Sequence, residues 1–182
     1  MPVAPQSWAV LQAIQYRIWN EVKVGGVSPF TPFIPGDQAK YGGNPQGTIA
    51  NAVYIGVPKD WNITYTRQCH VIPFMREDVS WRALGGKVWD DADVYVRYCF
   101  NRVKVDWYQT EQDLINARDA TYVTFAQHAE LPFTPIVRAV KPMQVRQVPA
   151  YHHDEVIGRD WDCWGFLLHI SQEWFVTGGI TA

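Results

Sequence analysis

The sequence has few cysteines, and none lies in a pattern that binds metal or builds a disulfide framework. Its 182 residues include three cysteines, which are far apart and outside any CxxC pair: Cys69, Cys99 and Cys163. An odd number without close spacing argues against a disulfide-stabilised fold and against a zinc knuckle. We interpret the three as buried thiols in a reducing compartment, because free cysteine is among the most buried residue types.

Long apolar runs and an excess of one charge are also missing. The formal net charge is −2 and the pI is near 6.2, which argues against binding nucleic acid through bulk charge. The first basic residue is Arg17, so the N-terminus lacks the basic start of a secretory signal. The stretch WGFLLHISQEWFV (164–176) is too short for a bilayer, which requires ~20 apolar residues. No membrane contact is predicted.

Motifs for catalysis and cofactor binding are missing as well. The sequence has no GxSxG, P-loop or GxGxxG motif. YHHDE (151–155) supplies imidazoles and carboxylates, but without the HxxxH or HxH spacing that gathers metal ligands. We therefore predict a protein that is not an enzyme, with no catalytic residue, no cofactor and no metal. A small metal-dependent enzyme centred on His152, His153 and Asp154 is the remotest alternative.

The sequence does contain helix and strand patterns that fit a single domain over residues 1–182. Apolar residues recur at helical spacing in 7–23, and a near match to a capping box at Thr110 and Asp113 predicts a helix over about 111–127. Alternating or β-branched patterns predict strands at 51–57, 61–66, 68–75, 93–105, 136–148 and 164–176. The predicted fold class is α+β: a mostly antiparallel twisted sheet, with an N-terminal helix and a second helix packed on it.

Two of these strands carry much of the predicted core. In DVYVRYCFNRVKV (93–105), alternate residues share one apolar face: Val94, Val96, Tyr98 and Phe100. WGFLLHISQEWFV fits both a helical and a strand period, but its aromatic enrichment and Gly165 favour a strand. We predict that it is the last strand of the sheet.

A Pro- and Gly-rich segment at about 27–48 is predicted to be a long irregular loop. Loops beyond about 15 residues are uncommon in compact domains and are usually functional or disordered. Phe30, Phe33 and Tyr41 lie in this segment. We expect these aromatic residues to lie on another surface, such as that of another subunit.

Nine tryptophans are many for this length. Four of them fall in or beside predicted loops: Trp81, Trp89, Trp107 and Trp161. Exposed indoles suit a protein interface or a carbohydrate-binding surface. The first three are therefore assigned to the same candidate subunit interface as the aromatic residues of the 27–48 loop.

The acidic stretch WDDAD (89–93) is predicted to be a solvated turn that precedes a strand. Asp91 and Asp93 alternate as in a calcium loop, but the Gly and the distal Glu of an EF-hand are missing. In a ring-shaped assembly, Asp90, Asp91 and Asp93 are candidates to line or rim the opening.

The order of these elements resembles the tail terminator proteins of long-tailed bacteriophages. In that resemblance, WAVLQAIQYRIWNEV is the first helix, DVYVRYCFNRVKV is a central strand, and EQDLINARDATYVTF is the helix packed on the sheet. IVRAVKPMQVRQV and WGFLLHISQEWFV then form the terminal hairpin. The resemblance covers most of the chain.

The resemblance implies a structural virion protein of the tail or neck, assembled in the host cytoplasm. Its subunits would form a ring, typically a hexamer, that caps the tail tube, ends its polymerisation and joins it to the head. The implied partners are copies of the chain, the tail tube protein and a neck or head-completion protein. The 27–48 loop would be an arm between subunits. DNA would only pass through the lumen, where the three acids at 90, 91 and 93 would repel phosphates over about 8–10 Å.

Other classes of protein remain open. One is another head–tail connector or a β-rich interaction module. The other is a carbohydrate-binding module that uses the loop tryptophans and would be monomeric.

Overall fold

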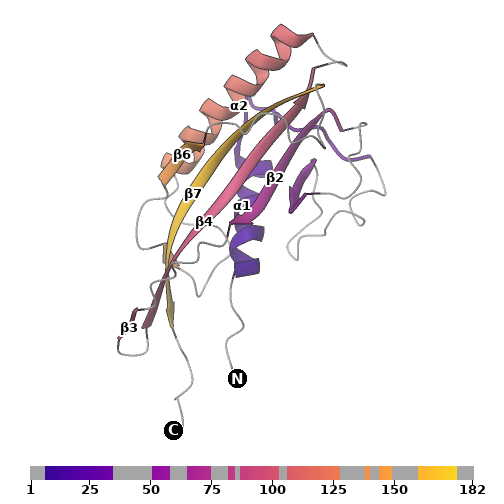
Figure 1. The fold of residues 1–182 in the computed structure, drawn as a ribbon. Helices are drawn as coiled ribbons and strands as arrows, with labels where there is room; N and C mark the ends of the chain where they lie inside the picture. The colour runs from indigo at the N-terminus through magenta and orange to yellow at the C-terminus, as the bar shows by residue number, and fades with distance from the viewer. Residues whose placement is uncertain are drawn as a thin grey trace.

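The computed structural model describes residues 7–34, 51–57, 65–74, 82–84, 87–102, 106–127, 138–139, 144–148 and 160–175 (Figure 1). Two helices lie in these ranges, α1 (Ser7–Glu21) and α2 (Trp107–Gln127). The strands are β1 (Val53–Ile55), β2 (Arg67–Phe74), β3 (Arg82–Leu84), β4 (Lys87–Asn101), β5 (Arg138–Ala139), β6 (Gln144–Val148) and β7 (Trp161–Phe175). The predicted α+β class is confirmed.

The strands form one sheet in the order β1-β2-β4-β7-β5, with β3 also on β4 and β6 also on β7. Every pairing is antiparallel except that of β1 with β2, so the expectation of a mostly antiparallel sheet is confirmed. The centre of the sheet is β4 paired with β7 over their whole lengths, from Lys87 opposite Phe175 to Asn101 opposite Trp161. The stretch that fitted both a helix and a strand is therefore the central strand β7.

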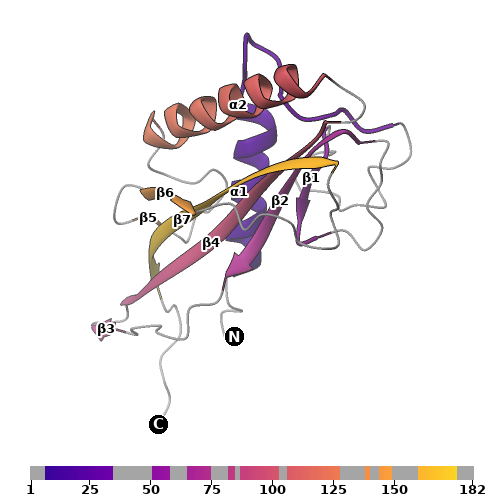
Figure 2. The same ribbon diagram turned by 45° about the horizontal axis from the view of Figure 1, so that its top comes forward.

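One side of the sheet, which we call the helix-facing side, carries the main core. The predicted apolar face of β4 is buried there, and the register places Trp164, Phe166 and Leu168 of β7 beside it. Both helices contact this side. Gln15 of α1 donates from Nε2 to the carbonyl of Val53 (2.7 Å), and the ring of Tyr122 in α2 packs edge-on against Trp164. Figure 2 shows α2 lying above the strands of the sheet.

Helix α1 follows its predicted apolar stripe. Ile14, Ile18 and Val22 are all buried in the core, as expected of a helix that lies on a sheet. The helix ends before Gly25 and Gly26, whose φ angles are 59° and 83°. Because only glycine adopts such angles without strain, these two residues explain why the chain turns here.

Helix α2 begins four residues earlier than the capping-box pattern predicted. The carboxylate of Asp106 accepts the backbone N–H groups of Tyr108 (2.9 Å) and Gln109 (3.3 Å), which makes Asp106 the N-cap. Thr110, the predicted cap, lies inside the first turn and donates its hydroxyl to the carbonyl of Asp106 (3.0 Å). The sequence pattern was right about the helix and wrong about its start.

Pro73 lies within β2, and one of the predicted strands is divided in two. Pro73 of β2 is opposite Val94 of β4. It lies beyond Val71, which is the last residue of β2 that pairs with β1. Counting from the hydrogen-bonded pair of Thr66 with Asn101, Pro73 and Val94 are a non-hydrogen-bonded pair. Among the described residues, the missing N–H of Pro73 therefore costs no ladder hydrogen bond. The strand predicted at 136–148 is two short strands, β5 and β6, separated by residues 140–143, which lie outside the described residues. Residues 61–64 of another predicted strand also lie outside them.

Candidate interaction surface

The two central strands continue beyond their neighbours. Strand β2 pairs with β4 only as far as Asp93, and β6 pairs with β7 only as far as His169. The remaining part, Lys87–Ala92 of β4 with Ile170–Phe175 of β7, is here called the β4–β7 ribbon. In the described part of the chain, only the short strands β3 and β5 flank this ribbon. Both views show β3 at its tip, beyond the two helices (Figures 1 and 2).

The three acidic residues predicted to form a turn lie in β4 instead. Asp90, Asp91 and Asp93 are opposite Gln172, Ser171 and His169 of β7. The expected solvated turn is therefore wrong, because β3 and β7 provide partners that extend β4 back to Lys87. Strand alternation assigns Asp91 and Asp93 to one side of the ribbon and Asp90 to the other.

The side of the ribbon that continues the helix-facing side is mostly apolar in sequence. The register pairs Val88 with Trp174 and Ala92 with Ile170, with Asp90 opposite Gln172 between them. An apolar sheet face that extends beyond its own helices is a surface on which a partner can pack.

Two aromatic residues of the predicted intersubunit loop belong to the core of their own chain. Phe30 packs edge-on against Tyr98, with ring centroids 5.0 Å apart, and is 2% exposed. Phe33 packs edge-on against Tyr54 and Tyr65, at 5.8 and 5.2 Å, and is 7% exposed. Their rings are covered by their own chain, so the expectation of a subunit contact is corrected for these two residues.

The structure describes only some of the other candidate residues. Trp89 is a position in β4 opposite Arg82 and Glu173, and Trp107 is the first residue of α2, so neither lies in a loop. Trp161 is a buried residue of β7. Tyr41, Trp81, residues 35–48 of the predicted loop, and His152, His153 and Asp154 lie outside the described residues.

The side of the sheet away from the helices holds a buried polar pair that the sequence analysis missed. His70 of β2 and Arg97 of β4 are directly opposite each other, with Arg97 Nη2 3.3 Å from His70 Nδ1. Burial lowers the pKa of His70 to about 3, and the charge of Arg97 lowers it too. The imidazole is therefore neutral and accepts at Nδ1. The sequence analysis assigned no role to either residue, because strand alternation identifies only the apolar face of β4.

Two of the three cysteines lie side by side on this same side of the sheet. Cys99 of β4 and Cys163 of β7 are opposite each other, and their Sγ atoms are 3.3 Å apart. Burial raises the pKa of the Cys99 thiol well above its ordinary value, and the hydrogen bond with Cys163 adds to this. The prediction of buried thiols is confirmed for Cys69 and Cys99, while Cys163 is half-buried. Spacing along the sequence could not reveal this pair.

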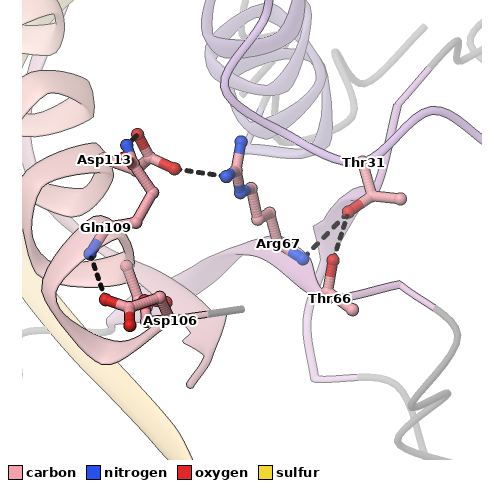
Figure 3. Close-up of polar contacts among 7 residues, drawn as sticks. Thr31, Thr66, Arg67, Asp106, Gln109 and Asp113 are labelled. Atoms are coloured by element: carbon pink, nitrogen blue, oxygen red, sulfur yellow. Dashed lines mark hydrogen bonds and ion pairs between the residues drawn. The ribbon is translucent and has the colours of Figure 1, made fainter. Parts of the chain in front are cut away.

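A polar junction joins the start of α2 to the sheet (Figure 3). The guanidinium of Arg67 in β2 forms an ion pair with the carboxylate of Asp113, which also accepts a hydrogen bond from Gln109 Nε2 (2.8 Å). The backbone N–H of Arg67 donates to Thr31 Oγ1 (2.9 Å). The junction therefore fixes the segment before β1 and the start of α2 to one end of β2.

No protein-family model matches the chain, and no curated protein matches it. Among the residues that the structure describes, no group of three or more His, Cys, Asp and Glu side chains is placed to hold a metal ion. Neither α1 nor α2 is long and apolar enough to cross a membrane. The class defined by the structure is an α+β protein with a projecting two-stranded ribbon.

Proposed function

We propose that the chain is a structural virion protein whose subunits form a ring that caps the phage tail tube, ends its polymerisation and joins it to the head. The observation that supports this most is the β4–β7 ribbon, which carries apolar positions beyond the helices of its own chain. The order of the helices and strands, which resembles that of tail terminators, supports it as well. The function requires surfaces for assembly rather than a catalytic group.

In the proposed ring, the ribbon of one subunit lies on the body of the next. Such a head-to-tail contact uses two different surfaces and closes when the rotation between subunits divides a full turn. Burying Val88, Ile170 and Trp174 there would remove apolar area from water, which is the main driving force of association. The β4 edge at Asp90–Ala92 pairs with no strand other than β7 in the described residues, so strand addition offers a second contact.

The acidic residues take a divided role in this proposal. Asp91 and Asp93 share the side of the ribbon opposite to Val88, Ile170 and Trp174 and are the ones proposed to face the lumen, where they would repel passing DNA over about 8–10 Å. Asp90 lies on the apolar side and is not proposed for the lumen. The proposed partners are the tail tube protein and a neck or head-completion protein, and the proposed location is the virion.

The test is the native mass by light scattering across a concentration series, with and without the tail tube protein. A stable ring, or a monomer that converts to rings with tube protein, supports the proposal. A monomer that is indifferent to tube protein overturns it. Binding to a neck protein without any effect on tube length would instead assign the chain to another connector of the neck.

Two neighbouring positions of β7 provide a matched pair of variants. Ile170→Asp places a charge on the apolar side of the ribbon, and Ser171→Asp places the same charge on the opposite side. We expect the first to abolish the ring and the second to retain it, with unchanged far-UV circular dichroism in both. If both variants assemble, the ribbon is not the contact surface.

A further inference from the structure

The two thiols at the start of β7 lie in the geometry from which a cross-strand disulfide closes. Cys99 is two residues before the end of β4, and Cys163 is two residues after the start of β7. They are direct partners in the ladder, and their sulfur atoms are 3.3 Å apart. No backbone rearrangement has to bring them together.

The backbone hydrogen bonds define which kind of strand pair this is. The N–H of Arg102 donates to the carbonyl of Asp160 (2.8 Å), one step beyond the end of the β4–β7 ladder. Hydrogen-bonded and non-hydrogen-bonded pairs alternate along an antiparallel ladder. Counting back from Arg102 makes Cys99 with Cys163 a non-hydrogen-bonded pair. The N–H of Asn101 agrees, since it donates to Thr66 on the other side of β4 (2.7 Å).

This type of pair matches the dimensions of a disulfide. Its Cα atoms are about 4.5 Å apart in antiparallel sheets. A disulfide requires a Cα–Cα distance of roughly 4.4–6.8 Å, so the pair lies at the short end of the permitted range. The hydrogen-bonded pairs on either side keep the two strands in register while the sulfur atoms rotate toward each other.

We propose that Cys99 and Cys163 form a reversible two-electron oxidation site, in which the cross-strand disulfide joins the two central strands of the sheet. The proposal does not depend on the proposed function, because the two cysteines belong to one chain and are brought together by its own fold.

The chemistry with a hydroperoxide balances without any further cofactor. The thiolate of Cys163, which is half-buried, attacks one peroxide oxygen; the O–O bond breaks and hydroxide leaves. The resulting sulfenic acid is attacked by the sulfur of Cys99, which loses its proton as the S–S bond forms and water leaves. Two thiols and one hydrogen peroxide thus become one disulfide and two waters. Thiols of an added reductant reverse the step by exchange.

The surroundings separate this pair from the third thiol. Cys99, Cys163 and Trp161 form a small cluster of their own, on the side of the sheet away from the helices. Cys69 is opposite Tyr98 on the helix-facing side and is fully buried in the main core. The sheet itself lies between Cys69 and the pair, so oxidation should select Cys99 and Cys163.

The first measurement uses the full-length purified chain at low concentration, treated with hydrogen peroxide or oxidised glutathione and then denatured under acid. We expect two of the three thiols to be lost, a peptide map that links Cys99 to Cys163, and migration as a monomer on a non-reducing gel. The bridge closes a loop between residues 64 positions apart. It should raise the Tm by roughly 5–10 °C, reversibly with dithiothreitol.

Two variants keep the result decisive. The Cys69→Ala variant keeps the pair intact. Oxidation should therefore remove both of its remaining thiols. Cys163→Ser changes the more accessible member conservatively and should abolish both the link and the rise in Tm. Persistence of all three thiols in the wild type, a bridge that includes Cys69, or a bridge between two chains would each overturn the proposal.

Discussion

Both sides of the sheet hold buried residues in its central part, but the two sides are stabilised by different physical effects. The helix-facing side is aromatic and aliphatic, and one of its polar atoms, the Tyr98 hydroxyl, lies 2.5 Å from Thr121 Oγ1. Thr121 donates its own hydrogen to the carbonyl of Ala117 (2.7 Å), so the tyrosine is the donor. The opposite side holds His70 against Arg97 and Cys99 against Cys163. The first side depends on packing, and the second on protonation and redox state.

This difference indicates which side of the sheet should make stability depend on pH or on oxidant. Burial of apolar area does not change with pH, whereas a buried ionisable group makes stability depend on pH when its pKa differs between the folded and unfolded states. We therefore expect truncations on the helix-facing side to lower stability at every pH. Changes on the opposite side should alter the dependence of stability on pH or oxidant.

The largest loss of stability is expected for Phe166→Ala on the helix-facing side. Phe166 is fully buried, and its ring packs against Trp164 and Tyr98 at centroid distances of 4.6 and 5.5 Å. Removing the ring leaves a cavity in the main core, so the free energy of unfolding should fall by about 3–5 kcal/mol. Urea unfolding measures this. The neighbouring Leu167→Ala, half-buried on the opposite side, is the control and should cost less than half as much; equal losses would contradict the comparison.

The second largest effect is expected to be the pH dependence of stability that arises from His70. Its pKa is about 3 in the folded protein and near 6.5 in the unfolded chain. The unfolded state therefore binds a proton first as the pH falls, and the stability present above pH 6.5 is lost as the pH falls toward 3. Between pH 6.5 and 4.5 this amounts to about 2 kcal/mol.

The variant His70→Gln isolates this contribution. Glutamine has no proton to gain, and its carbonyl oxygen can still accept from Arg97. Subtracting the variant's unfolding free energy from that of the wild type at each pH removes the contribution of the carboxylates. We expect the difference to shrink by about 2 kcal/mol on acidification over that range. A constant difference would mean that His70 is protonated in the folded protein as easily as in the unfolded one.

A smaller effect is expected at Gly165, where the opposite side is tightly packed. A Cβ atom built at this glycine would lie within 3 Å of the Tyr95 ring, which covers it from the neighbouring strand. Such an aromatic ring over a glycine stabilises a sheet by filling the missing side chain. Gly165→Ala should therefore cost about 1–2 kcal/mol, because the ring must move. In a Tyr95→Ala background the same change should cost much less, and an unchanged cost would exclude this explanation.

The sequence predicted the helix-facing side well and the opposite side poorly. The apolar alternation of Val94, Val96, Tyr98 and Phe100 identified the core because periodicity reports which face of a strand is buried. The same alternation says nothing of whether the polar residues His70 and Arg97 on the other face are buried. The pairing of Cys99 with Cys163 depends on the register of two strands far apart in sequence, which no local pattern contains.

The errors in the candidate site have the same origin. Asp90, Asp91 and Asp93 were expected in a turn because acidic residues have low strand propensity. Their pairing with β7 overrides that propensity, since tertiary contacts decide strand formation more than local preference does. Phe30 and Phe33 were expected at an interface because they lie in an irregular segment. Such a segment can still insert its aromatic side chains into the core of its own chain.

The smallest loss of stability is expected for an ion pair near the surface. It tests whether burial, rather than charge alone, makes the stability of the opposite side depend on pH. The ion pair of Arg67 with Asp113 has side chains 33% and 19% exposed, and the guanidinium also lies over the ring of Phe100. Asp113→Asn should lower the free energy of unfolding by at most ~1 kcal/mol, and less in high salt, because water and ions screen a pair at the surface. Asp119→Asn, whose carboxylate pairs with its neighbour Arg118 and is 59% exposed, is the control and should change nothing measurable. A loss at Asp113 as large as that at Phe166 would show that the junction of α2 with β2 holds the fold together as firmly as the core does.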